Sequence, residues 1–125
     1  MSSKETNEPF YSTSRRAGNL IYFSGFGPVD KGLHVIGSDI EDQTTYTMDL
    51  ISEALADEGV TFNDLVRVNV FLKDMNDRDK FNSTYMRYFN GPMPTRRLIG
   101  AGDLFKGILV EIDCVAYLPS TKRGS

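Results

Sequence analysis

The chain has 125 residues but only one cysteine, one histidine and no long apolar run. A single cysteine cannot form an intramolecular disulfide. No segment approaches the roughly 20 apolar residues that a helix needs to cross a bilayer, so a membrane-spanning protein is excluded. Residues 1–8 are polar and lack the apolar stretch of a secretion signal. We therefore expect a cytoplasmic protein with no membrane partner.

An excess of positive charge is also missing, since the formal net charge is −3. Basic residues occur in pairs at positions 15–16, 96–97 and 122–123, and scattered pairs of this kind are typical of solvated surface. We do not expect nucleic acid as a partner. His34 has no serine, cysteine or acidic neighbours at the spacing of a catalytic triad or a metal site. Neither a metal nor a cofactor is expected.

The residues that are present indicate one α+β domain over 9–119, between polar tails at 1–8 and 120–125. Apolar and β-branched patterns predict strands at 19–24, 33–36, 64–73, 95–101 and 107–117. Helical spacing predicts one helix from a capping box at 38–41 to Gly59, and another from Asp77 to Gly91. We expect a mixed sheet of about six strands, with both helices packed on one face.

The last predicted strand divides its side chains between the two faces of the sheet. Position 108 and every second residue to 116, including Cys114, are apolar or small and should face the helices, which makes Cys114 a small buried hydrophobe. The alternate set contains Glu111 and Asp113 among apolar residues. That mixture is too apolar for bare solvent and too charged for a closed core. Subunit association around a wet cleft would satisfy both requirements.

Arg96 and Glu111 are the candidate catalytic pair. An arginine at the start of one strand and a carboxylate in the next can serve as carboxylate clamp and water-activating base, in a cleft where neighbouring protomers touch. Burial should raise the pKa of Glu111 and a nearby Arg96 should lower it. Three alternatives stay open: Arg96 in a surface ion pair, Arg97 as the functional arginine, and Glu111 on a solvated edge.

From about Tyr11 to Tyr117 the chain resembles the RidA/YjgF family of imine deaminases. The resemblance rests on the order and spacing of five stretches: 18–25 (GNLIYFSG), 66–77 (VRVNVFLKDMND), 82–85 (NSTY), 94–96 (PTR) and 110–112 (VEI). It implies a chorismate-mutase-like α+β protomer, a homotrimer, and active sites in the clefts between subunits. In that family the arginine binds the substrate carboxylate, and the glutamate positions water for attack on a 2-imino acid. Arg96 and Glu111 occupy these positions.

The same resemblance implies that five further residues bind substrate, namely Tyr11, Ser24, Gly25, Asn82 and Leu98. The first four also have a plain structural explanation: a packed aromatic for Tyr11, a strand-ending turn for Ser24 and Gly25, and a bond to local backbone for Asn82. Leu98 stands where the family often has cysteine, and Phe26 replaces the glutamine of the family's Ser-Gly-Gln. A less polar pocket, with small residues at 100–102, would admit a larger or more apolar substrate.

The expected function is therefore hydrolysis of 2-imino acids to 2-oxo acids and ammonia by an enamine/imine deaminase. One alternative is a pathway-specific deaminase acting on an enamine such as aminomuconate or aminoacrylate. A second is a non-catalytic trimer that binds a small carboxylate. The third is RNA cleavage or translation inhibition, as in some relatives, which the acidic composition disfavours.

Overall fold

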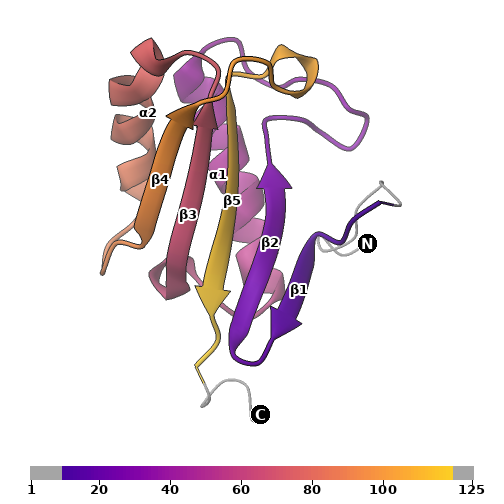
Figure 1. Ribbon diagram of the computed structural model, residues 1–125, viewed down its shortest axis with the longest axis vertical. Coiled ribbons are helices and arrows are strands. Elements are labelled where there is room, and N and C mark those ends of the chain that lie inside the picture. Colours follow the sequence, from indigo (N-terminus) through magenta and orange to yellow (C-terminus); the bar gives the residue numbers. More distant parts are fainter. Residues whose placement is uncertain (1–9, 120–125) are drawn as a thin grey trace.

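A computed structural model describes residues 10–119, so the expected tails at 1–8 and 120–125 lie outside the described residues. Within that range five strands form one mixed sheet in the order β1-β2-β5-β3-β4 (Figure 1). The strands are β1 (Ser14–Ala17), β2 (Leu20–Phe26), β3 (Leu65–Leu72), β4 (Thr95–Gly100) and β5 (Val110–Tyr117). Only β3 and β4 run parallel, while the other neighbouring strands pair antiparallel. The α+β class is confirmed.

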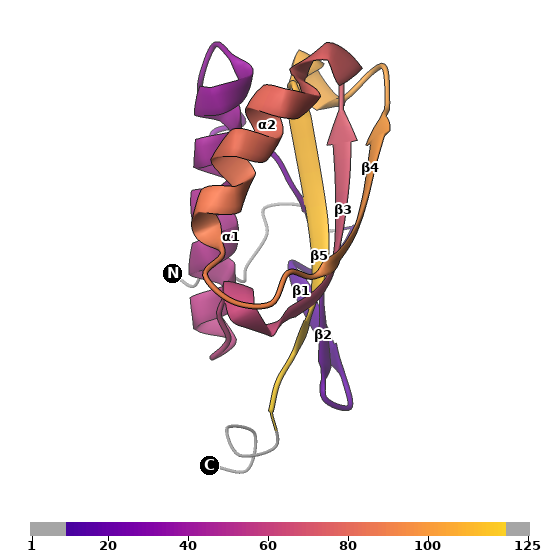
Figure 2. The same cartoon turned by 90° about the vertical axis from the view of Figure 1, so that its left-hand side faces the viewer.

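Two helices, α1 (Ile40–Asp57) and α2 (Arg78–Tyr85), cover one face of the sheet, and the other face carries no layer within the described residues (Figure 2). Short 3₁₀ turns at Phe62–Asp64, Met75–Asp77, Met86–Tyr88 and Phe105–Gly107 join the elements. Neither helix of the described part is long and apolar enough to span a membrane. The expected arrangement, with both helices on the same side, is confirmed.

The central strands β3 and β5 follow the period of two that their sequences predict. On β5, Val110, Ile112, Cys114 and Ala116 are buried against the helices, and Glu111, Asp113 and Val115 are half-buried on the other face. Each large apolar side chain that is fully buried stabilises the fold by about 1.5–3 kcal/mol. The helix layer meets this face through a stripe of aromatic side chains from α2 and its continuation, in which Phe81 stacks on Tyr85 and Tyr85 contacts Phe89.

Helix α1 is fixed at its start by polar contacts. Asp39, rather than the expected Ser38, is the N-cap, and its side chain accepts a hydrogen bond from the backbone N–H of Asp42. One turn further, the buried Gln43 donates to the carbonyl of Gly37 and accepts from the backbone N–H of Leu109. Since Leu109 directly precedes β5, this side chain sets the position of the strand that carries Glu111.

The prediction of a strand at 33–36 is wrong. Only an isolated bridge between Val29 and Val35 forms there, and the sheet has five strands rather than about six within the described residues. Leu33 has a φ of 64°, a left-handed conformation that interrupts an extended chain. The strand missing from the expectation is β1, whose four residues pair with β2 as an edge strand.

Val66 also departs from the expected pattern. Alternation along β3 places it with Val68 and Val70 on the helix side, but its side chain is 43% exposed. The register between β3 and β5 shifts between Leu65 and Arg67, so two neighbouring residues of β3 occupy the space of one. The irregularity turns Val66 outward while Leu65 and Val68 stay in the core.

Candidate functional site

Arg96 lies on the helix-covered face of the sheet. In the parallel pairing of β3 and β4 its partner is Val68, which is buried beneath the helices. Arg96 Nη1 donates a 2.8 Å hydrogen bond to Asn82 Oδ1 on α2. The guanidinium carbon is 5.1 Å from the ring centroid of Tyr85 and 5.9 Å from that of Phe81. Helix α2 therefore holds the guanidinium of Arg96, on the edge strand β4, through one hydrogen bond and two cation–π contacts.

Tyr85 also belongs to this arrangement, although it is not one of the site residues expected from the sequence. It is 3% exposed, and its hydroxyl has no hydrogen-bond partner among the described residues. Burial raises the pKa of Tyr85 to about 12 and the charge of Arg96 opposes that shift, so the phenol is neutral at physiological pH. Tyr85 follows Asn82 by three residues on the same helix. That i, i+3 spacing is the signal in the sequence that links the two residues.

Glu111 lies on the opposite, uncovered face of the sheet. Its cross-strand partner on β3 is Phe71, which is half-buried. On the other side β2 is irregular between Phe23 and Phe26, which pair with Cys114 and Ile112, so three steps along β2 oppose two along β5. A β-bulge of this kind bends a strand and re-aims its backbone. Gly25 lies in the bulge and faces the Glu111 carboxylate.

The carboxyl of Glu111 is poised to hold a proton more readily than an exposed glutamate. Burial, followed by the negative charge of Asp113, raises its pKa. Asp113 is the next residue on the same strand face and accepts a 2.8 Å hydrogen bond from Asn69 Nδ2. Arg96 does not contribute to the shift within one protomer. Side chains along a strand alternate between its two faces, so the pattern that places Glu111 on this face also places Asp113 beside it. Asp113 is not one of the site residues expected from the sequence.

Gly25 leaves room for the Glu111 carboxylate where that side chain now lies. A Cβ atom there would lie 2.7 Å from Glu111 Oε2, too close for real atoms. Gly25→Ala is expected to displace the Glu111 carboxylate. If that carboxylate acts in catalysis, as the resemblance implies, kcat/KM should fall roughly tenfold or more, since small misplacements of catalytic groups are costly. Steady-state kinetics check this result. In a Glu111→Gln background the alanine should have no further effect, and an equal loss in both backgrounds would contradict the explanation.

The other expected site residues divide between these two places. Leu98 pairs with Val70 on β3 and is half-buried on the same side as Arg96. Ser24 is half-buried beside Gly25, and its hydroxyl donates a 2.5 Å hydrogen bond to the carbonyl of Ser12. Tyr11, 51% exposed, directly precedes that segment.

The candidate residues therefore form two groups on opposite faces of the sheet, which we call half-sites. The arginine half-site contains Arg96, Asn82, Leu98 and Tyr85, and the glutamate half-site contains Glu111, Gly25 and Ser24. Tyr11 directly precedes the Ser12–Thr13 segment that binds Ser24. A single chain does not bring Arg96 and Glu111 together. A shared cleft requires a second copy whose glutamate half-site meets the arginine half-site of the first. Arg97, by contrast, pairs with Asn69 and shares the uncovered face with Glu111.

Cys114 and His34 lie outside both half-sites. Burial raises the pKa of the Cys114 thiol to about 12, so it is protonated and inert, as expected of a buried small residue. His34 is largely exposed and contacts Asp30 in the loop before α1. Among residues 10–119 no cluster of three or more histidine, cysteine or acidic side chains has the arrangement of a metal site.

The chain is similar in sequence to proteins from archaea and fungi. It is 38% identical over 108 residues to a RutC family protein of Pyrococcus horikoshii, covering 86% of each chain. Identity to the mitochondrial protein mmf2 of Schizosaccharomyces pombe is 36% over 109 residues, covering 85% of this chain and 86% of the relative.

Solved structures share the fold along nearly the whole chain. Yeast YEO7 aligns with a TM-score of 0.87 at 28% identity, covering 95% of this chain and 96% of that one. RidA from the Antarctic bacterium Psychrobacter aligns with a TM-score of 0.85 at 26% identity, covering 94% and 97%. The family model described as endoribonuclease L-PSP matches residues 4–118. These matches agree with the motifs at 18–25, 82–85 and 94–96, and the chain belongs to the RidA/YjgF family.

Proposed function

We propose that the protein is an enamine/imine deaminase that hydrolyses 2-imino acids to 2-oxo acids and ammonia. The observation that carries the proposal is the way Arg96 is held. One guanidinium nitrogen donates to Asn82, and the guanidinium carbon lies 5.1 Å and 5.9 Å from the centroids of the Tyr85 and Phe81 rings, so the guanidinium is held in place before any ligand binds. The guanidinium offers further N–H donors, and two parallel donors match a carboxylate.

Glu111 supplies the acid–base chemistry in this proposal. Its carboxylate accepts a proton from water while the water oxygen attacks C2 of the iminium, giving a carbinolamine. Glu111 then returns the proton to the nitrogen, the C–N bond breaks as ammonia leaves, and the oxygen's remaining proton passes to solvent water as the carbonyl forms. The products are a 2-oxo acid and ammonia. A raised pKa suits a group that must both take and give a proton near neutral pH.

The proposed assembly is a homotrimer with its active sites between subunits. Large apolar side chains on the uncovered face, including Tyr22, Tyr117 and Ile99, are 48%, 42% and 41% exposed in one protomer. Such surface on a sheet face favours association. A closed ring in which each arginine half-site meets the next protomer's glutamate half-site would complete one site per interface. The substrate carboxylate would then link the two chains.

The activity is tested by ammonia release from 2-imino acids generated enzymatically in situ. Wild type should accelerate release, and Arg96→Ala and Glu111→Gln, each still folded and oligomeric, should fall close to the spontaneous rate. Equal rates for all three proteins would exclude the mechanism. Binding of a 2-oxo acid that depends on Arg96, without turnover, would instead establish a carboxylate-binding trimer.

Two further measurements distinguish the general deaminase from a pathway-specific deaminase and from an RNA-cleaving protein. A substrate panel should favour imino acids with larger or apolar side chains over those of alanine and serine, because Leu98 lines the arginine half-site. A strong preference for one conjugated enamine would identify a pathway-specific deaminase. RNA cleavage that survives Arg96→Ala and Glu111→Gln would place a second activity elsewhere on the chain.

The pH dependence gives a separate prediction about Glu111. Asp113→Asn removes the neighbouring negative charge that helps to raise the pKa of Glu111. Because Glu111 acts deprotonated, the acid limb of kcat/KM should shift to lower pH, while an asparagine can still bond Asn69. Asp79→Asn, at an exposed position on α2, is the matched control. An acid limb that stays in place would show that Glu111 does not set it.

A further inference from the structure

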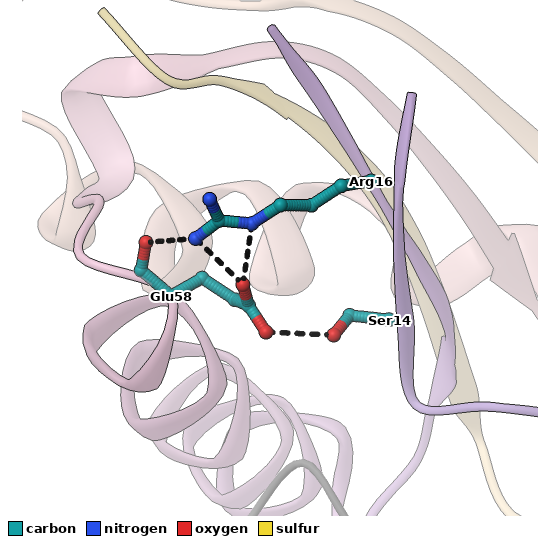
Figure 3. A network of polar contacts seen from close by, with 3 residues as sticks. All are labelled: Ser14, Arg16 and Glu58. Atoms are coloured by element: carbon teal, nitrogen blue, oxygen red, sulfur yellow. Dashed lines mark hydrogen bonds and ion pairs between the residues drawn. The ribbon is translucent and has the colours of Figure 1, made fainter. Parts of the chain in front are cut away.

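The end of α1 is tied to the N-terminal edge strand by a buried carboxylate (Figure 3). Glu58 caps α1, and its side chain is 7% exposed. Ser14 Oγ donates 2.9 Å to Glu58 Oε2, and Arg16 Nε donates 3.1 Å to Oε1. A second guanidinium nitrogen, Nη2, lies 3.1 Å from Oε1 and donates 3.3 Å to the Glu58 carbonyl. Both partners belong to β1, so the Glu58 side chain binds two residues of that strand, Ser14 and Arg16, that lie two positions apart.

Helix stability does not explain a carboxylate at this position. The carbonyl end of a helix carries partial negative charge, which disfavours an acidic side chain there. No basic residue lies in the last turn of α1 to compensate. The compensation comes from Arg16, which neutralises the carboxylate and also binds a carbonyl at the helix end. The arrangement makes physical sense as a link between α1 and β1.

The linked strand leads directly into the glutamate half-site. Strand β1 has four residues and lies at the edge of the sheet, where β2 is its one strand partner among residues 10–119. Immediately before it, the carbonyl of Thr13 accepts a 2.9 Å hydrogen bond from the Ser24 N–H, and Ser12 accepts from the Ser24 hydroxyl. Ser24 precedes Gly25, which faces Glu111. The position of Tyr11 thus depends on how firmly β1 is held.

We propose that Glu58 is a positioning residue, which fixes residues 11–13 beside the glutamate half-site by gripping Ser14 and Arg16 from the helix layer. The effect of Glu58 on catalysis rests on the proposed function, whereas the link between Glu58 and β1 does not. Arg16 is 48% exposed, so loss of Glu58 leaves it solvated rather than buried without a partner. Replacing Glu58 should therefore loosen β1 more than it destabilises the whole domain.

The first arm measures amide hydrogen exchange on the full-length protein. Glu58→Leu should speed exchange of the Ser24 N–H roughly tenfold or more, because local opening of the edge strand frees that donor. Exchange at the Val70 N–H, in the central strand β3, should change much less. Glu58→Gln keeps an acceptor for Arg16 and should restore most of the protection. Glu53→Leu, at an exposed position on the same helix, is the control. Unchanged exchange at Ser24 overturns the proposal.

The second arm separates positioning from stability by a double-mutant cycle. Glu58→Leu should lower kcat/KM roughly tenfold in the wild-type background and have almost no effect in a Tyr11→Ala background. Its effect on the melting temperature should be the same in both. Equal kinetic losses in the two backgrounds would overturn the positioning role. A wild type without deaminase activity would reject the proposed function, and the exchange arm alone would then decide whether Glu58 holds the segment.

Discussion

Arg96→Lys is expected to lower kcat/KM roughly 100-fold although the positive charge remains. Lysine cannot present two parallel donors to a carboxylate, and a hydrogen bond to a charged group is worth about 1.5–3 kcal/mol. Its compact ammonium also lacks the planar group that contacts Tyr85 and Phe81, and so loses part of a cation–π contribution of about 0.5–2 kcal/mol. Since about 1.4 kcal/mol corresponds to a factor of ten, these losses together give the stated size.

The matched control for this substitution is the neighbouring arginine. Arg97→Lys changes an exposed residue on the other face of β4, so its kcat/KM should stay within about twofold of wild type. The pair of variants also tests which arginine is functional. If Arg97→Lys shows the large loss and Arg96→Lys does not, the clamp belongs to Arg97, and Arg96 only fastens β4 to α2 through Asn82. Steady-state kinetics with the same 2-imino acid decide between them.

The sequence predicted the central part of the fold because its signals are local and repeated. Strand β5 has an apolar or small residue at every second position from Val110 to Ala116, with Glu111 and Asp113 between them, which indicates both its type and its buried face. Helix α1 has acidic residues in its first turn and an apolar stripe, and its start was placed within one residue. Such patterns need no knowledge of the neighbouring elements.

The errors occur where tertiary contacts decide the structure. Strand β1 has four residues, two of them arginines, and its pattern gives no signal of a strand. It forms because β2 offers an unpaired edge and Glu58 anchors Arg16 from another layer. Residues 33–36 have β-forming composition, but Leu33 adopts a left-handed conformation after the turn. The exposure of Val66 depends on a register shift that only the pairing with β5 reveals.

The sequence indicates which residues are candidates for the site but not how they are arranged in space. The motifs at 94–96 and 110–112 identify Arg96 and Glu111, and the spacing within each strand gives their neighbours. The relative faces of β4 and β5 depend on their separate registers with β3, which couples positions far apart in sequence. For that reason the separation of the two side chains by the sheet appears only in the structure.

This separation leads to the second large prediction, which concerns mixed oligomers. Arg96→Ala and Glu111→Gln should each be nearly inactive alone. Unfolding the two variants together in equal amounts and refolding them should restore activity. A site between protomers needs an intact Arg96 from one chain and an intact Glu111 from its neighbour. Random assembly supplies that combination at about one site in four, so about a quarter of wild-type activity should return.

The control for the mixing experiment is a pair of variants within one half-site. Arg96→Ala mixed with Asn82→Ala should gain much less, because an intact arginine half-site must come from a single chain and neither variant supplies it. If Arg96 and Glu111 instead act within one protomer, the first mixture stays inactive as well, since no chain then carries both residues. Recovery in the first mixture alone therefore requires that each protomer contributes one face of its sheet to one active site and the opposite face to another.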